Sequence, residues 1–178
     1  MTGTTLNRRA RRALAIAVLC LPVLAVMPAG CKLFRRTPMQ STVNTRDPRV
    51  AGQLLDGFYG IESGAWRWTA KDFSVKLKTP VEAATKGATL RFILTVPQVV
   101  IDKSGPVTLS AKVGGTELAP ETYSSAGENL SYQREVPSNA LGGSETVVNF
   151  HLDKSFVPGG QDLRELGLVA TTIALESK

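Results

Sequence analysis

Apolar and polar residues alternate along most of the chain after residue 65. Successive side chains of a strand point to opposite faces of a sheet, so this period of two predicts strands with one dry and one solvated face. Phe92 and Phe150 both fall on dry positions, whereas Lys76 falls on a solvated one. The strands predicted in this way cover residues 66–69, 73–78, 90–96, 107–113, 116–118, 130–136, 148–152 and 167–175.

Glycine and proline separate these segments. Gly105-Pro106, Gly142-Gly143 and Pro158-Gly159-Gly160 lie between predicted strands, and Gly114-Gly115 suits a two-residue hairpin turn. About eight short strands without a long helical pattern indicate an all-β protein, an antiparallel β-sandwich or jelly roll. We expect this domain to span residues 51–178.

The first 31 residues contain the parts of an export signal. A mostly apolar run from Ala13 to Met27 is followed by Pro28-Ala29-Gly30-Cys31. Small residues directly before a cysteine resemble a bacterial lipoprotein signal, in which the cysteine receives the lipid. Residues 1–31 are therefore predicted to be a lipoprotein-type signal peptide, with Cys31 as the lipid attachment site. The arginines that precede the apolar run are Arg8, Arg9, Arg11 and Arg12.

This signal predicts an exported protein that is anchored to a membrane of the cell envelope. Residues 32–50 are basic and polar and contain two prolines, which favours a tether between the membrane and the domain. Two alternatives stay open, an uncleaved anchor and a plain secreted form. Pro28 stands where the lipoprotein pattern prefers leucine, and the uncharged run from Ala13 to Cys31 is close to the minimum length that spans a bilayer.

Composition and charge exclude several classes of protein. The chain has 178 residues and a formal net charge of +6, but four of its 21 basic residues belong to the signal and the remainder nearly balances 15 acidic residues. A body this close to neutral is not expected to bind nucleic acid. Both cysteines, Cys20 and Cys31, lie in the signal, so the domain has no disulfide framework, thiol nucleophile or cysteine-bound zinc.

Catalytic and metal-binding patterns are weak in this sequence. His151 is the only histidine, and its apolar neighbours belong to the opposite face of the same predicted strand, which places the imidazole in solvent. A glycosidase-like carboxylate pair drawn from Glu62, Asp162 and Glu165 is a less favoured alternative. We expect no enzyme, no cofactor and no metal site, although a structural calcium in a loop stays open.

The most informative feature is a cluster of aromatic residues at the start of the domain. Phe58, Tyr59, Trp66 and Trp68 lie close together, and on a strand Trp66 and Trp68 point to one face. Two interpretations stay open: the indoles form a platform that stacks against sugar rings, or they fill one side of the core with their N–H groups bonded to the backbone. Packing is favoured, because large aromatic side chains are usually buried.

These residues also carry a resemblance to a known family. The run Gly57-Phe58-Tyr59-Gly60-Ile61-Glu62 followed by Trp66-Arg67-Trp68-Thr69 resembles the opening of a β-sandwich accessory module found on bacterial glycosyltransferases and cell-surface glycan proteins. The end of that module carries an Asp-x-Arg-x-Leu-Gly element, matched here by Asp162, Arg164, Leu166 and Gly167. The resemblance covers about residues 57–177 and implies a jelly-roll fold with a link to envelope glycans.

The resemblance also gives the charged residues at the two ends of the domain a structural role. If the first and last strands are neighbours, Glu62 pairs with Arg164, or Asp162 with Arg67, and the sandwich is closed. The function predicted from the sequence is that of a non-catalytic lipoprotein with a β-sandwich module at the cell envelope, with glycan binding as the leading hypothesis. The alternative is an envelope scaffold or assembly protein that binds another protein.

Overall fold

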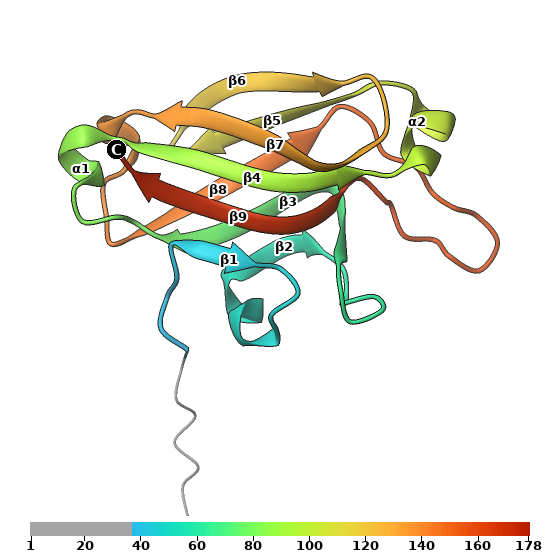
Figure 1. Cartoon of the computed structure of the whole chain (residues 1–178), viewed down its shortest axis with the longest axis horizontal. Helices are drawn as coiled ribbons and strands as arrows, with labels where there is room; N and C mark the ends of the chain where they lie inside the picture. Colours follow the sequence, from blue (N-terminus) through green and yellow to red (C-terminus); the bar gives the residue numbers. More distant parts are fainter. Residues whose placement is uncertain (1–36) are drawn as a thin grey trace, which may run out of the picture. The chain divides into compact units, whose positions relative to one another are not determined.

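The computed structural model describes residues 37–178, and in that part of the chain it confirms an all-β antiparallel fold. The described residues form nine strands, and every pairing between them is antiparallel (Figure 1). The strands are β1 (Thr42–Asn44), β2 (Leu54–Phe58), β3 (Arg67–Lys78), β4 (Ala88–Val96), β5 (Val107–Val113), β6 (Thr116–Tyr123), β7 (Gly127–Val136), β8 (Glu145–Leu152) and β9 (Val169–Ser177).

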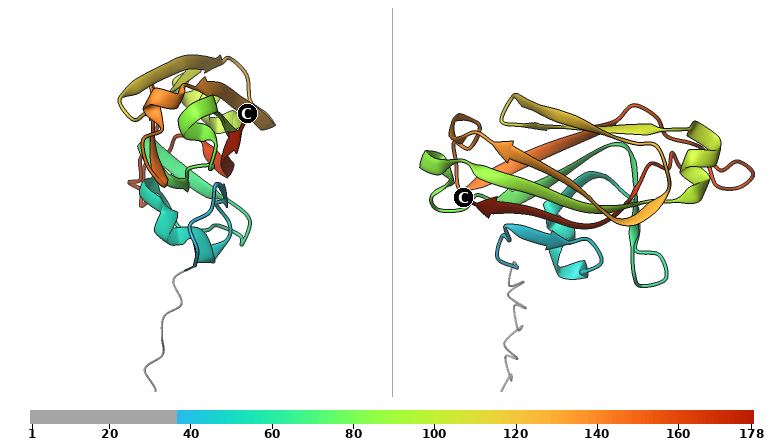
Figure 2. Two further views of the ribbon diagram at one scale, coloured as in Figure 1. Left: turned by 90° about the vertical axis from the view of Figure 1, so that its left-hand side faces the viewer. Right: turned by 45° about the horizontal axis from the view of Figure 1, so that its top comes forward.

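The strands form two layers that share one long strand, β3 (Figure 2). One layer has the order β9-β4-β7, and β1 pairs along β9. The other has the order β3-β8-β5-β6, and β2 pairs along β3. The first residues of β3, Arg67 and Trp68, pair with β9, whereas residues 72–78 pair with β8. β3 therefore carries the chain from one layer into the other.

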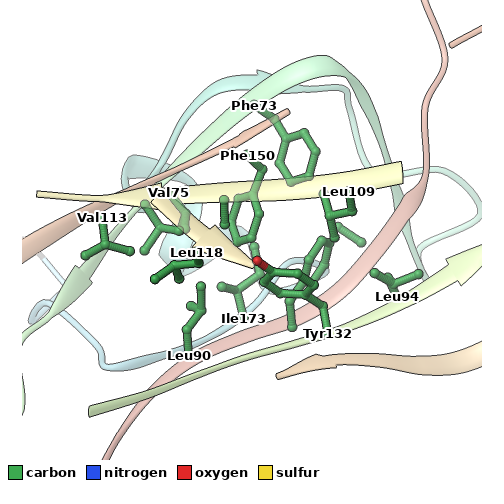
Figure 3. Close-up of a cluster of buried hydrophobic side chains, with 14 of the residues drawn as sticks. Phe73, Val75, Leu90, Leu94, Leu109, Val113, Leu118, Tyr132, Phe150 and Ile173 are labelled. Atoms are coloured by element: carbon green, nitrogen blue, oxygen red, sulfur yellow. The ribbon is translucent and has the colours of Figure 1, made fainter. Parts of the chain in front are cut away.

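The core lies between the layers, and it includes the residues that the alternation assigned to the dry faces of β3, β4 and β8. Phe150 stacks on Phe73 with the ring centroids 4.9 Å apart (Figure 3). The ring centroid of Phe92 lies 5.1 Å from that of Phe150. Phe92 is fully buried and Phe150 is 2% exposed. The predicted register of β3, β4 and β8 is therefore confirmed, and the two layers hold each other through a cluster of aromatic rings.

Side chains close the seam between β6 and β7, the two strands at the ends of the sheet order. The Tyr132 hydroxyl donates to the carbonyl of Ala119 at 2.9 Å, and Arg134 Nε donates to the same carbonyl at 2.7 Å. Burial raises the pKa of Tyr132 to about 12, so the hydroxyl keeps its proton and remains a donor. These contacts use backbone groups that an open sheet edge would leave unpaired.

The helices are short. They are α1 (Ala83–Lys86), α2 (Gln98–Ser104) and the 3-10 turns η1 (Pro48–Gln53) and η2 (Ser138–Ala140). Among the described residues, no helix is both long and apolar enough to cross a membrane.

Two sequence expectations need correction. The predicted strands 66–69 and 73–78 are not separate: residues 67–69 and 73–78 belong to the single strand β3, whereas Trp66 lies just before it and forms only an isolated bridge with Glu62. The predicted tether 32–50 extends too far: β1 pairs with β9, and Val43 is fully buried against the core. A single apolar residue between polar neighbours has no detectable period, so the sequence pattern missed this strand. The predicted signal, including Cys31, lies outside the described residues.

Removal of one ring from the aromatic cluster is expected to destabilise the domain strongly. Phe150→Ala should lower the free energy of unfolding by about 3–5 kcal/mol, because the cavity lies between two packed layers. The control, Lys76→Ala, removes only a surface ion pair to Glu145 and should cost less than about 1 kcal/mol. Chemical denaturation of both variants measures the difference. A larger loss for Lys76→Ala would mean that the register of β3 and β8 is wrong.

Candidate functional site

The candidate site is built where the start of β3 meets the segment just before β9. Thr69 is fully buried, and its amide donates to the carbonyl of Leu168 at 2.8 Å. The Gly167 amide donates to the Thr69 carbonyl at 2.7 Å, and the Leu168 amide donates to the Thr69 hydroxyl at 3.1 Å. These three bonds hold the beginning of the first long strand against the approach to the last strand.

Gly167 permits this close approach. A Cβ atom at this position would clash with Leu152 Cδ1 and would lie 2.9 Å from the carbonyl oxygen of Ala70. Gly57 has a comparable role in β2, where its φ of +71° and the nearby carbonyl of Asp72 leave no room for a side chain. Two glycines of the family-like pattern therefore have packing reasons for being glycine.

A short hairpin before β3 presents the first tryptophan. The Glu62 amide donates to the Trp66 carbonyl at 2.9 Å, and the Ala65 amide donates to the Glu62 carbonyl at 3.0 Å. Ser63 and Gly64 both have positive φ, as a tight hairpin turn of this hand requires. Trp66 thus lies on a small, internally bonded projection and not within the sheet.

A hollow opens beside the two tryptophans on the outer face of the β9-β4-β7 layer. Its volume is about 820 Å³, within the range of pockets that bind small molecules. The pairing of β4 is irregular beside the hollow: its register shifts against β9 between Ile93 and Leu94, and against β7 between Leu94 and Val96. Such bulges change the direction of side chains and bend the surface. The lining residues are Arg46, Glu62, Ala65, Trp66, Trp68, Thr95, Pro97, Glu128, Asn129, Val169 and Thr171.

The sequence left open whether the two tryptophans form a binding platform or pack in the core, and the structure shows features of both. Trp66 is 37% exposed, whereas Trp68 is half-buried and packs edge to face against Phe156 at 6.2 Å. Trp68 also contacts the core, and both indoles line the hollow. Tyr59 does not line it: its hydroxyl donates to the Glu165 carbonyl at 2.9 Å.

The predicted charge pairs are only partly formed. Arg164 Nη1 donates to Glu62 Oε1 at 2.6 Å, so the structure brings these two residues together. Arg164 also donates to both oxygens of Asp162, at 2.9 and 2.8 Å. Arg67 does not reach Asp162, because its guanidinium donates to the carbonyls of Thr45 and Tyr59. The Asp162–Arg67 alternative is therefore wrong.

The ion cluster of Arg164 with Glu62 and Asp162 fixes one wall of the hollow. Hydrogen bonds from Arg164 lower the pKa of Asp162 to about 2. Hydrogen bonds to Asp162 and Glu62 raise the pKa of Arg164 above its ordinary value. Arg164 pairs with the Glu62 carboxylate, which is itself a lining residue, but it shares its single positive charge between Glu62 and Asp162. The cluster holds the segment 153–168 to the hairpin that carries Trp66.

The remaining charges of the hollow balance each other. Arg46 and Glu128 line it, and neither makes a salt bridge within the described residues. Besides Glu62, which shares the charge of Arg164 with Asp162, the lining contains one positive and one negative side chain. The lining also contains hydroxyl and amide groups from Thr95, Thr171 and Asn129. The surface therefore offers aromatic faces, hydrogen-bonding groups and little net charge.

The other chemical candidates lie apart from the hollow. His151 Nδ1 lies 2.7 Å from Asp72 Oδ1, and both side chains are well exposed on the other layer. Glu165 accepts a hydrogen bond from the Ser155 hydroxyl at 2.6 Å. Within residues 37–178, no group of three or more His, Cys, Asp or Glu side chains is placed to hold a metal ion.

Of the eleven residues that line the hollow, the sequence pointed to three, Glu62, Trp66 and Trp68. Arg46, Thr95, Glu128, Asn129 and Thr171 come from four separate segments. The alternation places Thr95 on the outer face of its strand, but only the pairing of β4 with β7 and β9 puts it beside the others. Asn129, which has a φ of 52°, is a strained bulge residue that no local pattern marks.

Comparison with known proteins identifies no relative of this chain. No protein-family model matches the chain, and no curated protein matches it either. The resemblance to a glycan-associated module therefore stays a prediction that rests on the residues quoted for it.

Acid should weaken the ion cluster in a defined range of pH. The pKa of Asp162 is lowered from 3.8 to about 2, so its carboxylate stabilises the fold above about pH 4 and loses this effect as the pH falls toward 2. Asp162→Asn should melt at a lower temperature than the parent protein at neutral pH, and the difference should vanish near pH 2.

The control for this experiment is Asp56→Asn, which changes an exposed carboxylate that makes no salt bridge within the described residues. Its melting temperature should follow that of the parent protein at every pH. A constant difference between parent and Asp162→Asn from neutral pH down to pH 2 would contradict the assigned pairing.

Proposed function

We propose that this protein is a non-catalytic lipoprotein of the cell envelope whose β-sandwich binds glycan in the hollow beside Trp66 and Trp68. One observation carries the proposal: the only two tryptophans of the chain line the same hollow, and one of them is exposed. An exposed indole gives up hydrophobic stabilisation, so a surface that keeps an exposed indole beside a second, half-buried one is typical of a binding site.

The chemistry of the lining supports a sugar ligand. A pyranose ring has apolar C–H faces that fit an indole and a rim of hydroxyl groups that need hydrogen-bond partners. Trp66 and Trp68 supply the flat faces, while Thr95, Asn129 and Glu128 supply polar atoms at the same level of the sheet. Pockets of this kind fix a ligand with a few polar groups on a largely apolar wall.

The export signal supports a position at the envelope. The first described residue, Thr37, follows Cys31 by six positions, and a fully extended chain of that length reaches about 20 Å. A lipid on Cys31 would therefore hold the domain close to the membrane surface, where envelope glycans are within reach.

A second candidate is an envelope scaffold that binds another protein. Leu163 and Val157 favour it, because these apolar side chains are 79% and 55% exposed on the segment that Arg164 holds in place. This surface lies outside the hollow, since neither residue is among the lining residues. Binding of an envelope protein that is lost on Leu163→Ser and retained on Trp66→Ala would support the scaffold.

Loss of either indole should weaken glycan binding, with different effects on stability. Trp66→Ala should weaken binding at least about tenfold, which corresponds to about 1.4 kcal/mol, and should change stability by less than about 1 kcal/mol. Trp68→Ala should weaken binding and also cost about 2–3 kcal/mol of stability, because Trp68 packs on Phe156.

Tryptophan emission measures this binding directly, because both tryptophans of the protein line the hollow. The full-length protein in mild detergent is titrated with soluble neutral, cationic and anionic polysaccharides. Leu163→Ala is the control, since it removes an exposed apolar side chain away from the hollow. Unchanged emission and no retention on any of the polysaccharides would refute glycan binding.

The anchor is tested separately. Cys31→Ala should release the protein from the membrane fraction or leave it as an uncut precursor, because the lipid acceptor is gone. Fractionation, gel mobility and metabolic labelling with a radioactive fatty acid measure these changes. Identical partition, size and labelling of parent and variant would contradict the lipoprotein prediction and leave the fold unaffected.

A further inference from the structure

The hollow crosses the sheet instead of lying between two strands. Trp68 pairs with Val169, and Val169 pairs on its other side with Thr95. Thr95 in turn faces Glu128 and Asn129, since the register shift between Leu94 and Val96 places these residues opposite it. A single row of lining residues therefore runs over the adjacent strands β3, β9, β4 and β7.

The length of this row exceeds what one sugar ring needs. Three spaces between neighbouring strands of about 4.8 Å each give about 14 Å from the β3 side to the β7 side. The indoles lie at one end, and Glu128 and Asn129 lie at the other. A ligand that contacts both ends must be extended and must lie across the strands.

The backbone at the β7 end of the row adopts an unfavourable conformation at Asn129. Asn129 has a φ of 52°, a conformation that non-glycine residues rarely adopt. Its side chain is exposed and makes no hydrogen bond among those of the described residues, so the amide is free to bind a ligand. Strain of this kind is found where a surrounding structure positions a residue for function.

The charges of the row set the class of glycan. Glu62 is engaged by Arg164, which also binds Asp162, and Arg46 and Glu128 contribute one charge of each sign. A strongly anionic or cationic chain would gain attraction at one of these residues and repulsion at the other. A chain without net charge has no such penalty.

We propose that the hollow binds an extended segment of a neutral, linear glycan that lies across β3, β9, β4 and β7, with sugar rings on the tryptophans and further rings at Asn129. This proposal rests on the proposed function and specifies its ligand. A terminal sugar would occupy the indole end alone, whereas an extended segment uses both ends of the row.

The experiment combines chain length with variants at each end. The probes are β-1,4-linked oligomers of two to six sugars, in two neutral series (glucose and N-acetylglucosamine) and two charged series (glucosamine and mannuronate). Asn129→Gly removes the amide and keeps the positive φ accessible. Asn139→Gly, at an exposed asparagine outside the hollow, is the matched control. The full-length protein in mild detergent is titrated by calorimetry.

Affinity for a neutral series should rise with chain length and then stay constant once the row is filled. Asn129→Gly should weaken binding of the hexamer about three- to tenfold, the usual effect of one lost hydrogen bond, and should leave binding of the dimer unchanged. Trp66→Ala should weaken binding of both, and Asn139→Gly should weaken neither.

Two results would overturn the inference while glycan binding stands. Equal affinities for dimer and hexamer, together with a harmless Asn129→Gly, would show that only the indole end is used. Tighter binding of a charged series than of both neutral ones would show that the charge argument is wrong. No response to any of the four series would contradict the proposed function as well.

Discussion

The fold depends on one close approach between segments that are far apart in the sequence. Thr69 can form its hydrogen bonds with Gly167 and Leu168 only because residue 167 lacks a side chain, which would otherwise meet Leu152 and the backbone of Ala70. Through this contact the first residues of β3 join β9 while the rest of the strand pairs with β8. One strand thereby ties both layers together, and the packing of the aromatic core follows from that geometry.

The same approach creates the candidate site. The chain that leads into β3 must come from outside the sheet, and it does so as the hairpin of residues 62–66. The chain that leads into β9 passes beside this hairpin, where Arg164 reaches Glu62 and Asp162. Buried backbone bonds and an exposed ion cluster therefore act on the same junction. The buried hydrogen bonds contribute more to the stability of this junction than the ion pairs do, because solvent screens ion pairs at the surface.

The sequence was most informative where a period of two continues over several residues. The dry positions of β3, β4, β5 and β8 were predicted from alternation alone, since burial of one face fixes which residues are apolar. β1 was missed because three residues with one buried valine carry no period. The Glu62–Arg164 contact was predicted only on the condition that the first and last strands are neighbours. The order of strands in the sheet decides this, and local sequence patterns do not reveal it.

The hollow shows the limit of such prediction more clearly. Trp66 and Trp68 were identified by residue type, but whether they face a cavity depends on the register shifts of β4. A bulge shifts one strand by a residue and leaves almost no trace in hydrophobic pattern.

The two tryptophans also show how this surface can serve binding and stability together. Trp68 packs edge to face with Phe156 and contacts the core, and Trp66 lies on a hairpin whose own hydrogen bonds hold it. The polar lining residues, by contrast, are at most half-buried side chains on the outer face of a sheet whose inner face carries the core. Changes at Thr95, Glu128 or Asn129 can therefore alter the ligand with little effect on the packed interior. A change at Trp68 affects both, which makes it the residue that couples the site to the fold.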